Sequence, residues 1–422
     1  MNYLTLYRQW RPQAFREVVG QKHTITGLQN AVREGQPAHA YLFFGPRGSG
    51  KTSVAKILAK AVNCPHQEDG EPCNACASCK DINNGSFMDV IEIDAASNRG
   101  IDEIRDLREK VRVLPAQGKK KVYIIDEVHM LTTEAFNALL KTLEEPPESV
   151  IFILATTESH KVPATVLSRC QRYAFTRLST AEVVGRLKEV AEDKGVRVSE
   201  QALEIMARRS SGSLRDALGI LEQCLAFSAG DIDVPQVLDV LGLVNSEALA
   251  EIFKAMMAQK AETVLLTLNT LIGQGKEPMQ IARDAALCVR DLLQYQLLGS
   301  RAELLIMTPD GIDDMRADIS WSNIPRGKLS RVIKQLLKLA DELRFNEGQR
   351  FLLEVGFLEA METLAGPAAE PVAEARPKTK EKPRPAGSFN NWDEVMERVK
   401  ALKVTTHALL VPAVMLGLED GV

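Results

Sequence analysis

The chain has 422 residues, of which 45% are hydrophobic and 26% are charged, and its formal net charge is −4. This length is too great for a single hydrophobic core, so roughly two to four domains are expected. The composition excludes extensive disorder, and the negative charge excludes a generally basic nucleic-acid coat while leaving room for a local basic surface.

The N-terminal sequence bears on where the protein resides. The start MNYLTLYRQWRP carries Arg8 and Arg11 where a secretion signal needs an apolar stretch. No apolar run in the sequence approaches the roughly 18 residues of a membrane span. We therefore expect a cytoplasmic protein, in which clustered cysteines are thiols or metal ligands because the cytosol keeps thiols reduced.

Between Tyr41 and Arg177, short apolar runs alternate with helical patterns, which is typical of a parallel sheet flanked by helices. Apolar side chains recur at helical spacing in 132–147, so this segment is expected to cover the sheet. The sequence therefore predicts an α/β domain at 1–177. Its strands, each expected to be buried on both faces, are 41–44, 90–93, 122–125 and 151–154.

A phosphate-binding loop follows the first predicted strand and precedes a helical pattern. It fits the motif G-x-x-x-x-G-K-[ST], and its residues are Gly45, Pro46, Arg47, Gly48, Ser49, Gly50, Lys51 and Thr52. Glycines let backbone amides surround the β- and γ-phosphates, Lys51 supplies a mobile positive charge, and Thr52 offers a hydroxyl to Mg²⁺. The alternative is a chance glycine-rich turn, which the strand, spacing and helix together disfavour. The sequence predicts an ATP site.

Four cysteines cluster directly after the helix that follows this loop: Cys64, Cys73, Cys76 and Cys79. Their spacing suits tetrahedral Zn²⁺, and four thiolates close the coordination sphere, so the predicted zinc knuckle at 64–79 is structural and not catalytic. Two alternatives stay open. His66 could replace one cysteine as a ligand, or the four side chains could be free thiols in a loop.

Two acidic residues, Asp126 and Glu127, end the apolar run KVYIIDE. Their carboxylates are expected at the C-terminal edge of the sheet, where open α/β folds bind ligands. Asp126 is predicted to hold Mg²⁺ through water, and Glu127 to polarise the attacking water as general base. The alternative is a pair of solvated acids at a strand end, which the adjacent phosphate-binding loop disfavours.

The rest of the chain is predicted to be helical, with a less structured end. We expect a small helical domain at 178–242 and a larger all-α domain at 243–364 that could pack against copies of itself. The proline-rich segment 365–388 cannot bury enough apolar surface to fold and is expected to be a disordered linker. The final segment, 389–422, reads as a short, truncated piece of a larger module.

Taken together, the motifs resemble those of the AAA+ clamp-loader ATPases, in particular the bacterial DNA polymerase III gamma/tau family. The resemblance extends from Tyr3 to about Leu364, and its most specific marks are the cysteine cluster and the tripeptide Ser-Arg-Cys. The motifs are RPQAF-x-x-VVGQ (11–21), GPRGSGKT (45–52), IIDEVHML (124–131), NALLKTLEEPP (137–147), ATTE (155–158), LSRC (167–170) and GSLRDAL (212–218).

The resemblance implies roles that periodicity does not. The segment at Val18 and Val19 lies against the adenine, and Thr157 is the polar sensor near the γ-phosphate. Arg215 reaches the nucleotide from the small helical domain, which acts as a lid. Arg169 is the arginine finger on the ATP of a neighbouring subunit, where its guanidinium stabilises developing charge and makes hydrolysis depend on assembly. The alternative that both arginines pair with surface carboxylates stays open.

The resemblance further implies an ATP hydrolase within the DNA polymerase III holoenzyme, without a polymerase centre of its own, that loads a sliding clamp on primed DNA. Implied partners are delta- and delta-prime-type subunits, copies of itself, the clamp, and polymerase and helicase through the C-terminal region. Primer-template DNA is contacted through its backbone, for which Arg99 and Lys141 are candidates. The protein is then cytoplasmic and nucleoid-associated. Alternatives are another AAA+ DNA motor, such as a branch-migration helicase, and a non-catalytic loader scaffold.

Overall fold

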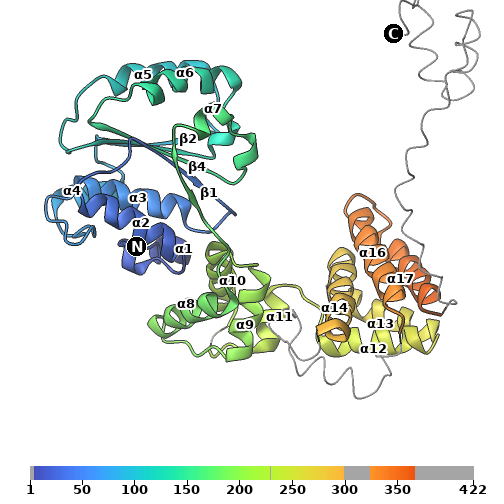
Figure 1. The fold of residues 1–422 in the computed structure, drawn as a ribbon. Coiled ribbons are helices and arrows are strands. Elements are labelled where there is room, and N and C mark those ends of the chain that lie inside the picture. The colour runs from blue at the N-terminus through green and yellow to red at the C-terminus, as the bar shows by residue number, and fades with distance from the viewer. Residues whose placement is uncertain (1–3, 229, 299–323, 366–422) are drawn as a thin grey trace, which may run out of the picture. The chain divides into compact units, whose positions relative to one another are not determined.

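The computed structural model describes residues 4–228, 230–298 and 324–365. The predicted linker at 365–388, apart from its first residue, and the predicted segment at 389–422 lie outside the described residues. Helices and strands carry the labels of Figure 1.

A five-stranded parallel sheet forms the centre of the N-terminal domain, in the order β2-β3-β4-β1-β5 (Figure 1). The four predicted strands are confirmed, but the expected burial on both faces is wrong for β2, whose residues are half-buried or exposed at the edge of the sheet. The fifth, β5, was not predicted, because it is a short edge strand with mostly exposed residues and no apolar run. The strands are β1 (Ala40–Phe44), β2 (Val90–Asp94), β3 (Lys121–Asp126), β4 (Val150–Thr156) and β5 (Gln171–Ala174).

Helices cover both faces of this sheet (Figure 1). Side chains alternate along a strand, so Ile124 packs into one hydrophobic cluster and Tyr123 into the other. On the second face, Tyr123 stacks on Phe152 with 5.4 Å between ring centroids. The first face is covered by α2 (Lys22–Arg33) and α3 (Lys51–Asn63), and the second by α5 (Ile101–Val111) and α6 (Thr133–Glu144).

Short elements connect these strands and helices, and the first of them packs into the hydrophobic cluster of the helices that follow the sheet domain. They are α1 (Leu6–Gln9), the 3₁₀ helix η1 (Phe15–Glu17), α4 (Ala77–Asn84), η2 (Val128–Met130), η3 (Ser159–Lys161) and α7 (Ala164–Leu167).

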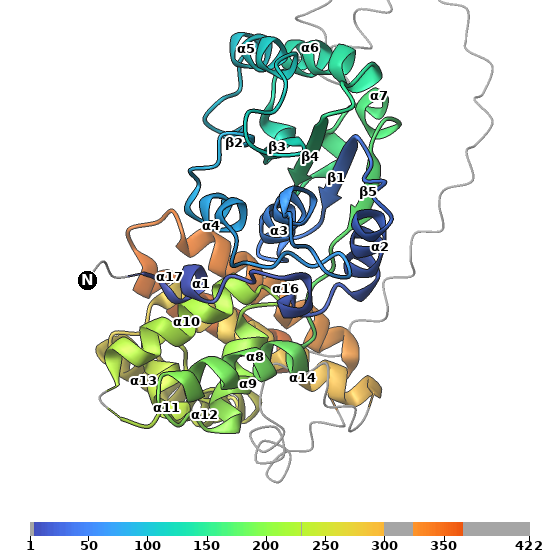
Figure 2. The ribbon, with the colours of Figure 1, turned by 90° about the vertical axis from the view of Figure 1, so that its left-hand side faces the viewer.

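Four helices with their own hydrophobic cluster follow the sheet domain, grouped together in Figure 2. The first begins with a capping box, in which Ser179 and Glu182 satisfy each other's backbone amides. The core includes Leu187, Met206 and Leu221, all fully buried. The helices are α8 (Thr180–Asp193), α9 (Glu200–Arg209), α10 (Leu214–Phe227) and α11 (Val234–Val240).

Another helical group, with a separate cluster around Phe253, Leu336 and Phe357, forms the last described part of the chain. Its helices are α12 (Ser246–Met257), α13 (Ala261–Gly273), α14 (Pro278–Leu298), α16 (Arg326–Leu343) and α17 (Gln349–Ala365). The predicted fold class is therefore confirmed over the described residues: an α/β domain, a small helical domain and an all-α domain. Among those residues, no helix is both long and apolar enough to cross a bilayer.

Candidate functional site

The predicted phosphate-binding loop connects β1 to α3, with its glycines where only glycine fits. Gly48 has φ +74°, and a Cβ atom at this position would lie 2.0 Å from the Ser213 Oγ at the start of α10. At Gly45, a Cβ atom would lie 2.1 Å from the backbone oxygen of Phe175. The loop is therefore in close contact with the small helical domain through Gly48.

Lys51 and Thr52 begin α3 and face the acidic end of β3. The Lys51 side chain is buried, and its Nζ donates hydrogen bonds to the carbonyl oxygens of Gly45 (2.9 Å) and Pro46 (2.8 Å). Burial lowers the pKa of Lys51, while the carboxylates of Glu127 and Asp126 oppose that change. The Thr52 hydroxyl donates to Asp126 Oδ2 at 2.7 Å. These two oxygens are ligands of the kind that Mg²⁺ prefers.

Glu127 lies at the end of the same strand and contacts the next one. Its backbone is left-handed (φ 47°), and its Oε2 accepts hydrogen bonds from the Thr157 hydroxyl (3.0 Å) and the Thr157 amide (3.4 Å). The structure thus places Thr157 directly beside Glu127, at the C-terminal end of β4. The hydroxyl and the carboxylate are adjacent although they are far apart in sequence.

His129 is a site residue that the sequence analysis missed. Its side chain is 7% exposed, with Nδ1 lying 3.0 Å from Thr156 Oγ1 and 3.4 Å from Glu127 Oε2. Nε2 lies 3.3 Å from Glu158 Oε1. A hydrogen bond from Lys161 is the main cause that lowers the pKa of Glu158. The signal was the histidine two positions after the acidic pair in IIDEVHML, but spacing alone could not show that it bridges Glu127 and Glu158.

Arg11 was also missed, although it stands within a motif used for the resemblance. Its Nε donates to Ser53 Oγ at 3.0 Å, in the first turn of α3. Burial is the main cause that lowers the pKa of Arg11, and the nearby carboxylates of Glu92 and Asp126 oppose it. The Arg11 guanidinium therefore adds positive charge beside the phosphate-binding loop.

Val18 and Val19 lie where two hydrophobic clusters meet. Val18 packs against the cluster formed by β1 and α3, whereas Val19 packs against the cluster of the small helical domain. Gly20, with φ +67°, follows them, and a Cβ atom there would lie 2.6 Å from Leu178 Cδ2. The segment predicted to contact adenine is thus held between the sheet domain and the lid.

Arg169 and Arg215 both have partners within the chain. Arg169 Nη2 lies 2.7 Å from Glu144 Oε1, and Nη1 donates to the Thr165 carbonyl at 2.6 Å. The Arg215 guanidinium lies over the Tyr7 ring, 4.8 Å from its centroid. The ion pair of Arg169 is the contact that the alternative interpretation expected. Partly exposed pairs of this kind contribute about 0–1 kcal/mol, so they exchange partners readily.

The two candidates for DNA contact are both exposed. Arg99 precedes α5, and its Nε donates to the Ala96 carbonyl at 2.8 Å. Lys141 lies on α6, on the side away from the hydrophobic cluster. Contact with DNA stays a prediction for both.

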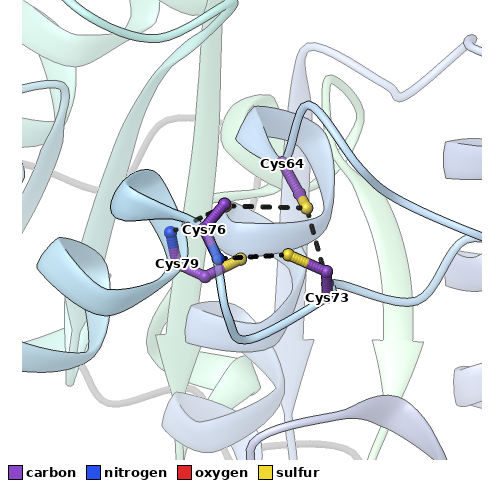
Figure 3. A group of neighbouring side chains, drawn as sticks. All are labelled: Cys64, Cys73, Cys76 and Cys79. Carbon is purple, nitrogen blue, oxygen red and sulfur yellow. Dashed lines mark hydrogen bonds between the residues drawn. The ribbon is translucent and has the colours of Figure 1, made fainter.

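The four clustered cysteines converge between α3 and α4 (Figure 3). Their Sγ atoms all lie within 4.8 Å of one another. Backbone amides donate to sulfur at 3.4 Å, from Cys73 to Cys64, from Cys76 to Cys73 and from Cys79 to Cys76. Amides of Ala75 and Cys76 lower the pKa of Cys73 to about 6.

This donor set fits a structural zinc site, because four neighbouring thiolates would fill the four-coordinate sphere of Zn²⁺ and backbone amides hydrogen-bond to three of the sulfur atoms. His66, the alternative ligand, is exposed and lies outside the group of four. Cys64 directly follows α3, and Cys76 is the N-cap of α4. The cluster therefore joins the end of the helix that starts at the phosphate-binding loop to the next helix.

Three family models match successive parts of the chain. They are described as DNA polymerase III, delta subunit (residues 20–179), DNA polymerase III clamp loader subunit, ATPase lid domain (182–230), and DNA polymerase III subunits gamma and tau domain III (232–371). The matches cover the sheet domain and both helical groups.

Curated relatives show the same likeness. DNA polymerase III subunit tau of Bacillus subtilis is 46% identical over 370 residues, covering 88% of this chain and 65% of the relative. DNA polymerase III subunit gamma/tau of Mycobacterium tuberculosis is 34% identical over 463 residues, covering 99% of this chain and 80% of the relative. The Escherichia coli subunit tau is 43% identical, but this chain covers 43% of it. The chain thus spans less than two thirds of several relatives.

Two solved structures are more distantly similar. The Thermotoga maritima RuvB Holliday junction branch migration motor has 20% identity and a TM-score of 0.43, over 59% of this chain and 79% of that one. The Bacillus subtilis DNA clamp loader delta protein has 14% identity and a TM-score of 0.35, over 80% and 99%. Both TM-scores are too low to support a functional comparison.

The close approach of Gly48 to Ser213 can be tested by adding a side chain at position 48. Gly48→Ala is expected to weaken ATP binding about tenfold or more, because a left-handed alanine costs roughly 1–2 kcal/mol and its Cβ displaces the loop or the lid. Gly35→Ala is the matched control, since Gly35 has φ +68° and nothing within 4 Å of the added carbon. Calorimetric titration of both variants with ATP checks this. Equal affinities would show that the contact does not shape the loop.

Proposed function

We propose, from the premise that this chain belongs to the DNA polymerase III gamma/tau family, that it binds and hydrolyses ATP as a subunit of a clamp loader. The carrying observation is the adjacency of Thr52 to Asp126 and of Thr157 to Glu127. These contacts bring three parts together at one place: the phosphate-binding loop, the two proposed oxygen ligands of Mg²⁺, and a proposed general base beside a polar sensor residue. The site residues support hydrolysis as well as binding.

The residues divide the chemistry among them. Amides of the loop 45–52 and the Lys51 ammonium hold the β- and γ-phosphates. Lys51 gives up its hydrogen bonds to the carbonyls of Gly45 and Pro46 to bind the phosphates. Thr52 and Asp126 hold Mg²⁺, which when bound neutralises phosphate charge. Glu127 takes a proton from the attacking water, and Thr157 orients that carboxylate. Val18 and Val19 contact the adenine.

Two arginines complete the proposed site, Arg215 from the small helical domain and Arg169 from the sheet domain of a neighbouring subunit. Arg215 moves from the Tyr7 ring to the nucleotide when the lid closes. Arg169 leaves its weak pair with Glu144 and acts on the ATP of a neighbouring subunit. Hydrolysis then depends on assembly, because the developing negative charge is neutralised by a residue that another chain supplies.

The partners follow from family membership and are part of the proposal. The chain assembles with delta- and delta-prime-type subunits and with copies of itself, through its all-α domain. ATP binding prepares the assembly to place a sliding clamp on primer-template DNA, which is gripped by its backbone, and hydrolysis releases the loader. The C-terminal region recruits polymerase and helicase. We place this activity in the cytoplasm, at the nucleoid.

Two other functions fit this site less well. A non-catalytic scaffold is disfavoured because Lys51, Asp126 and Glu127 are present and in contact with the expected elements. Another AAA+ DNA motor is disfavoured by the match to gamma and tau domain III over 232–371. The mass of the assembled particle separates a loader from a hexameric motor.

Glu127→Gln tests the catalytic assignment. ATP turnover of the full assembly with partner subunits, clamp and primed DNA is expected to fall about 10²–10⁴-fold, because a neutral amide cannot accept the proton of the attacking water. ATP affinity should remain, since Glu127 is the proposed general base and is not part of the phosphate-binding loop. Glu134→Gln, an exposed change on α6, is the control. Unchanged turnover in Glu127→Gln rejects the assignment, and no turnover above background in the unaltered assembly rejects the function.

We also propose that Cys64, Cys73, Cys76 and Cys79 hold one structural zinc ion. Elemental analysis of the purified chain should then find about one zinc per chain. Cys76→Ser is expected to lose most of it, because serine is a poor substitute for a thiolate ligand. Cys170→Ser, which changes a cysteine outside the group, should keep it. Equal zinc contents in the two variants would contradict the site.

A further inference from the structure

The zinc knuckle carries a tight turn that is not part of the cysteine cluster. Glu68 and Glu71 exchange backbone hydrogen bonds of 3.2 and 2.8 Å, and the two residues between them are left-handed, with φ 50° at Asp69 and 78° at Gly70. This is the geometry of a two-residue hairpin turn, for which Asp-Gly is a favoured sequence. The turn fixes Glu71 two positions before the first cysteine of the C-x-x-C-x-x-C run.

The carboxylate of Glu71 binds the N-terminal segment. Its Oε2 accepts a hydrogen bond from the Phe15 amide and its Oε1 one from the Arg16 amide, each at 2.8 Å. Oε1 also accepts from Gln29 Nε2 on α2 at 2.8 Å. Gly70 packs tightly here, because a Cβ atom would lie 2.6 Å from the Gln29 carbonyl oxygen. Both oxygens of Glu71 therefore clamp η1 to the knuckle.

A buried ammonium makes a second connection between the knuckle and the same segment. Lys60, on α3, is 1% exposed. Its Nζ donates to the carbonyl oxygen (2.7 Å) and Oε1 (2.8 Å) of Gln13, and to Asn74 Oδ1 (2.8 Å). Asn74 directly follows Cys73. The loop that carries the cysteines thus contributes a hydrogen-bond acceptor to Lys60 through Asn74. Glu71, in the same loop, contributes acceptors to the amides of η1.

The clamped segment leads directly to the proposed nucleotide site. Upstream, Arg11 binds Ser53 in the first turn of α3. Phe15 is 1% exposed and belongs to the same hydrophobic cluster as Val54 of α3. Val18 and Val19 follow Phe15 and Arg16 within a few residues. Any shift of the clamp at Phe15 and Arg16 is therefore transmitted along a short chain to the proposed adenine contact.

We propose that the knuckle is a positioning element for nucleotide binding, in which Glu71 holds the segment 13–19 in its binding conformation. This inference rests on the proposed nucleotide and zinc sites. A loop too short to form its own core depends on the metal for its order, so loss of the metal releases Glu71 and Asn74 from their positions. By linkage, metal and nucleotide must then stabilise each other's binding.

Glu71→Gln tests the coupling without touching a cysteine. It replaces one carboxylate oxygen by an NH₂ group that cannot accept the hydrogen bond of a backbone amide. In the full chain with zinc retained, ATP and ADP affinity should fall about tenfold. In the assembly, KM for ATP should rise while kcat changes little, because Glu71 does not touch the reacting atoms. Glu68→Gln, an exposed change on the opposite side of the same turn, is the control.

A second readout uses the metal itself. Release of zinc to a chelator should be slowed by ADP in the unaltered chain and in Glu68→Gln, and less so in Glu71→Gln. The inference is overturned if zinc-loaded Glu71→Gln binds ATP like the unaltered chain, or if ADP has the same effect on zinc release in all three. An unaltered chain that binds no nucleotide would instead overturn the proposed function, so the two failures are distinguishable.

Discussion

The site depends on the hydrogen bond between Thr52 and Asp126, which joins the start of α3 to the end of β3 at 2.7 Å. The strands β1, β4 and β3 lie side by side in parallel, so the phosphate-binding loop, Thr157 and Asp126 all emerge at one edge of the sheet. Fully buried side chains on both faces fix that register. The geometry of the site is therefore set by the packing of the core.

Several side chains of the proposed site are held by contacts within the chain that a bound ligand or a neighbouring subunit would replace. Lys51 binds loop carbonyls, Glu127 accepts from Thr157, and Arg169 pairs with Glu144. The Arg169–Glu144 pair is partly exposed and contributes little net free energy, whereas the buried Lys51 ammonium needs its carbonyl partners until another acceptor replaces them. In the proposed function, these charges are compensated within the chain until nucleotide and a neighbouring subunit supply alternative partners.

Sequence patterns predicted the elements that rest on local chemistry. Buried strands appear as apolar runs, and the phosphate-binding loop and cysteine cluster have specific spacings. The edge strand β5 was missed because its residues are mostly exposed. The contacts of Arg11, His129 and Glu71 were missed because each joins segments that are distant in sequence or orients a side chain that spacing leaves undefined. Such contacts are consequences of the fold, so a motif can contain the residue, as it does for Arg11 and His129, without indicating its partners.

The central claim is that ATP held by one chain is cleaved only when a neighbouring chain supplies Arg169. It is tested most directly by ATP turnover in the full assembly carrying Arg169→Ala, with Arg172→Ala, an exposed change on β5, as control. The account predicts a fall of about 10³-fold or more for Arg169→Ala, with ATP affinity retained and the control unaffected. Turnover as fast as that of the unaltered assembly would contradict it.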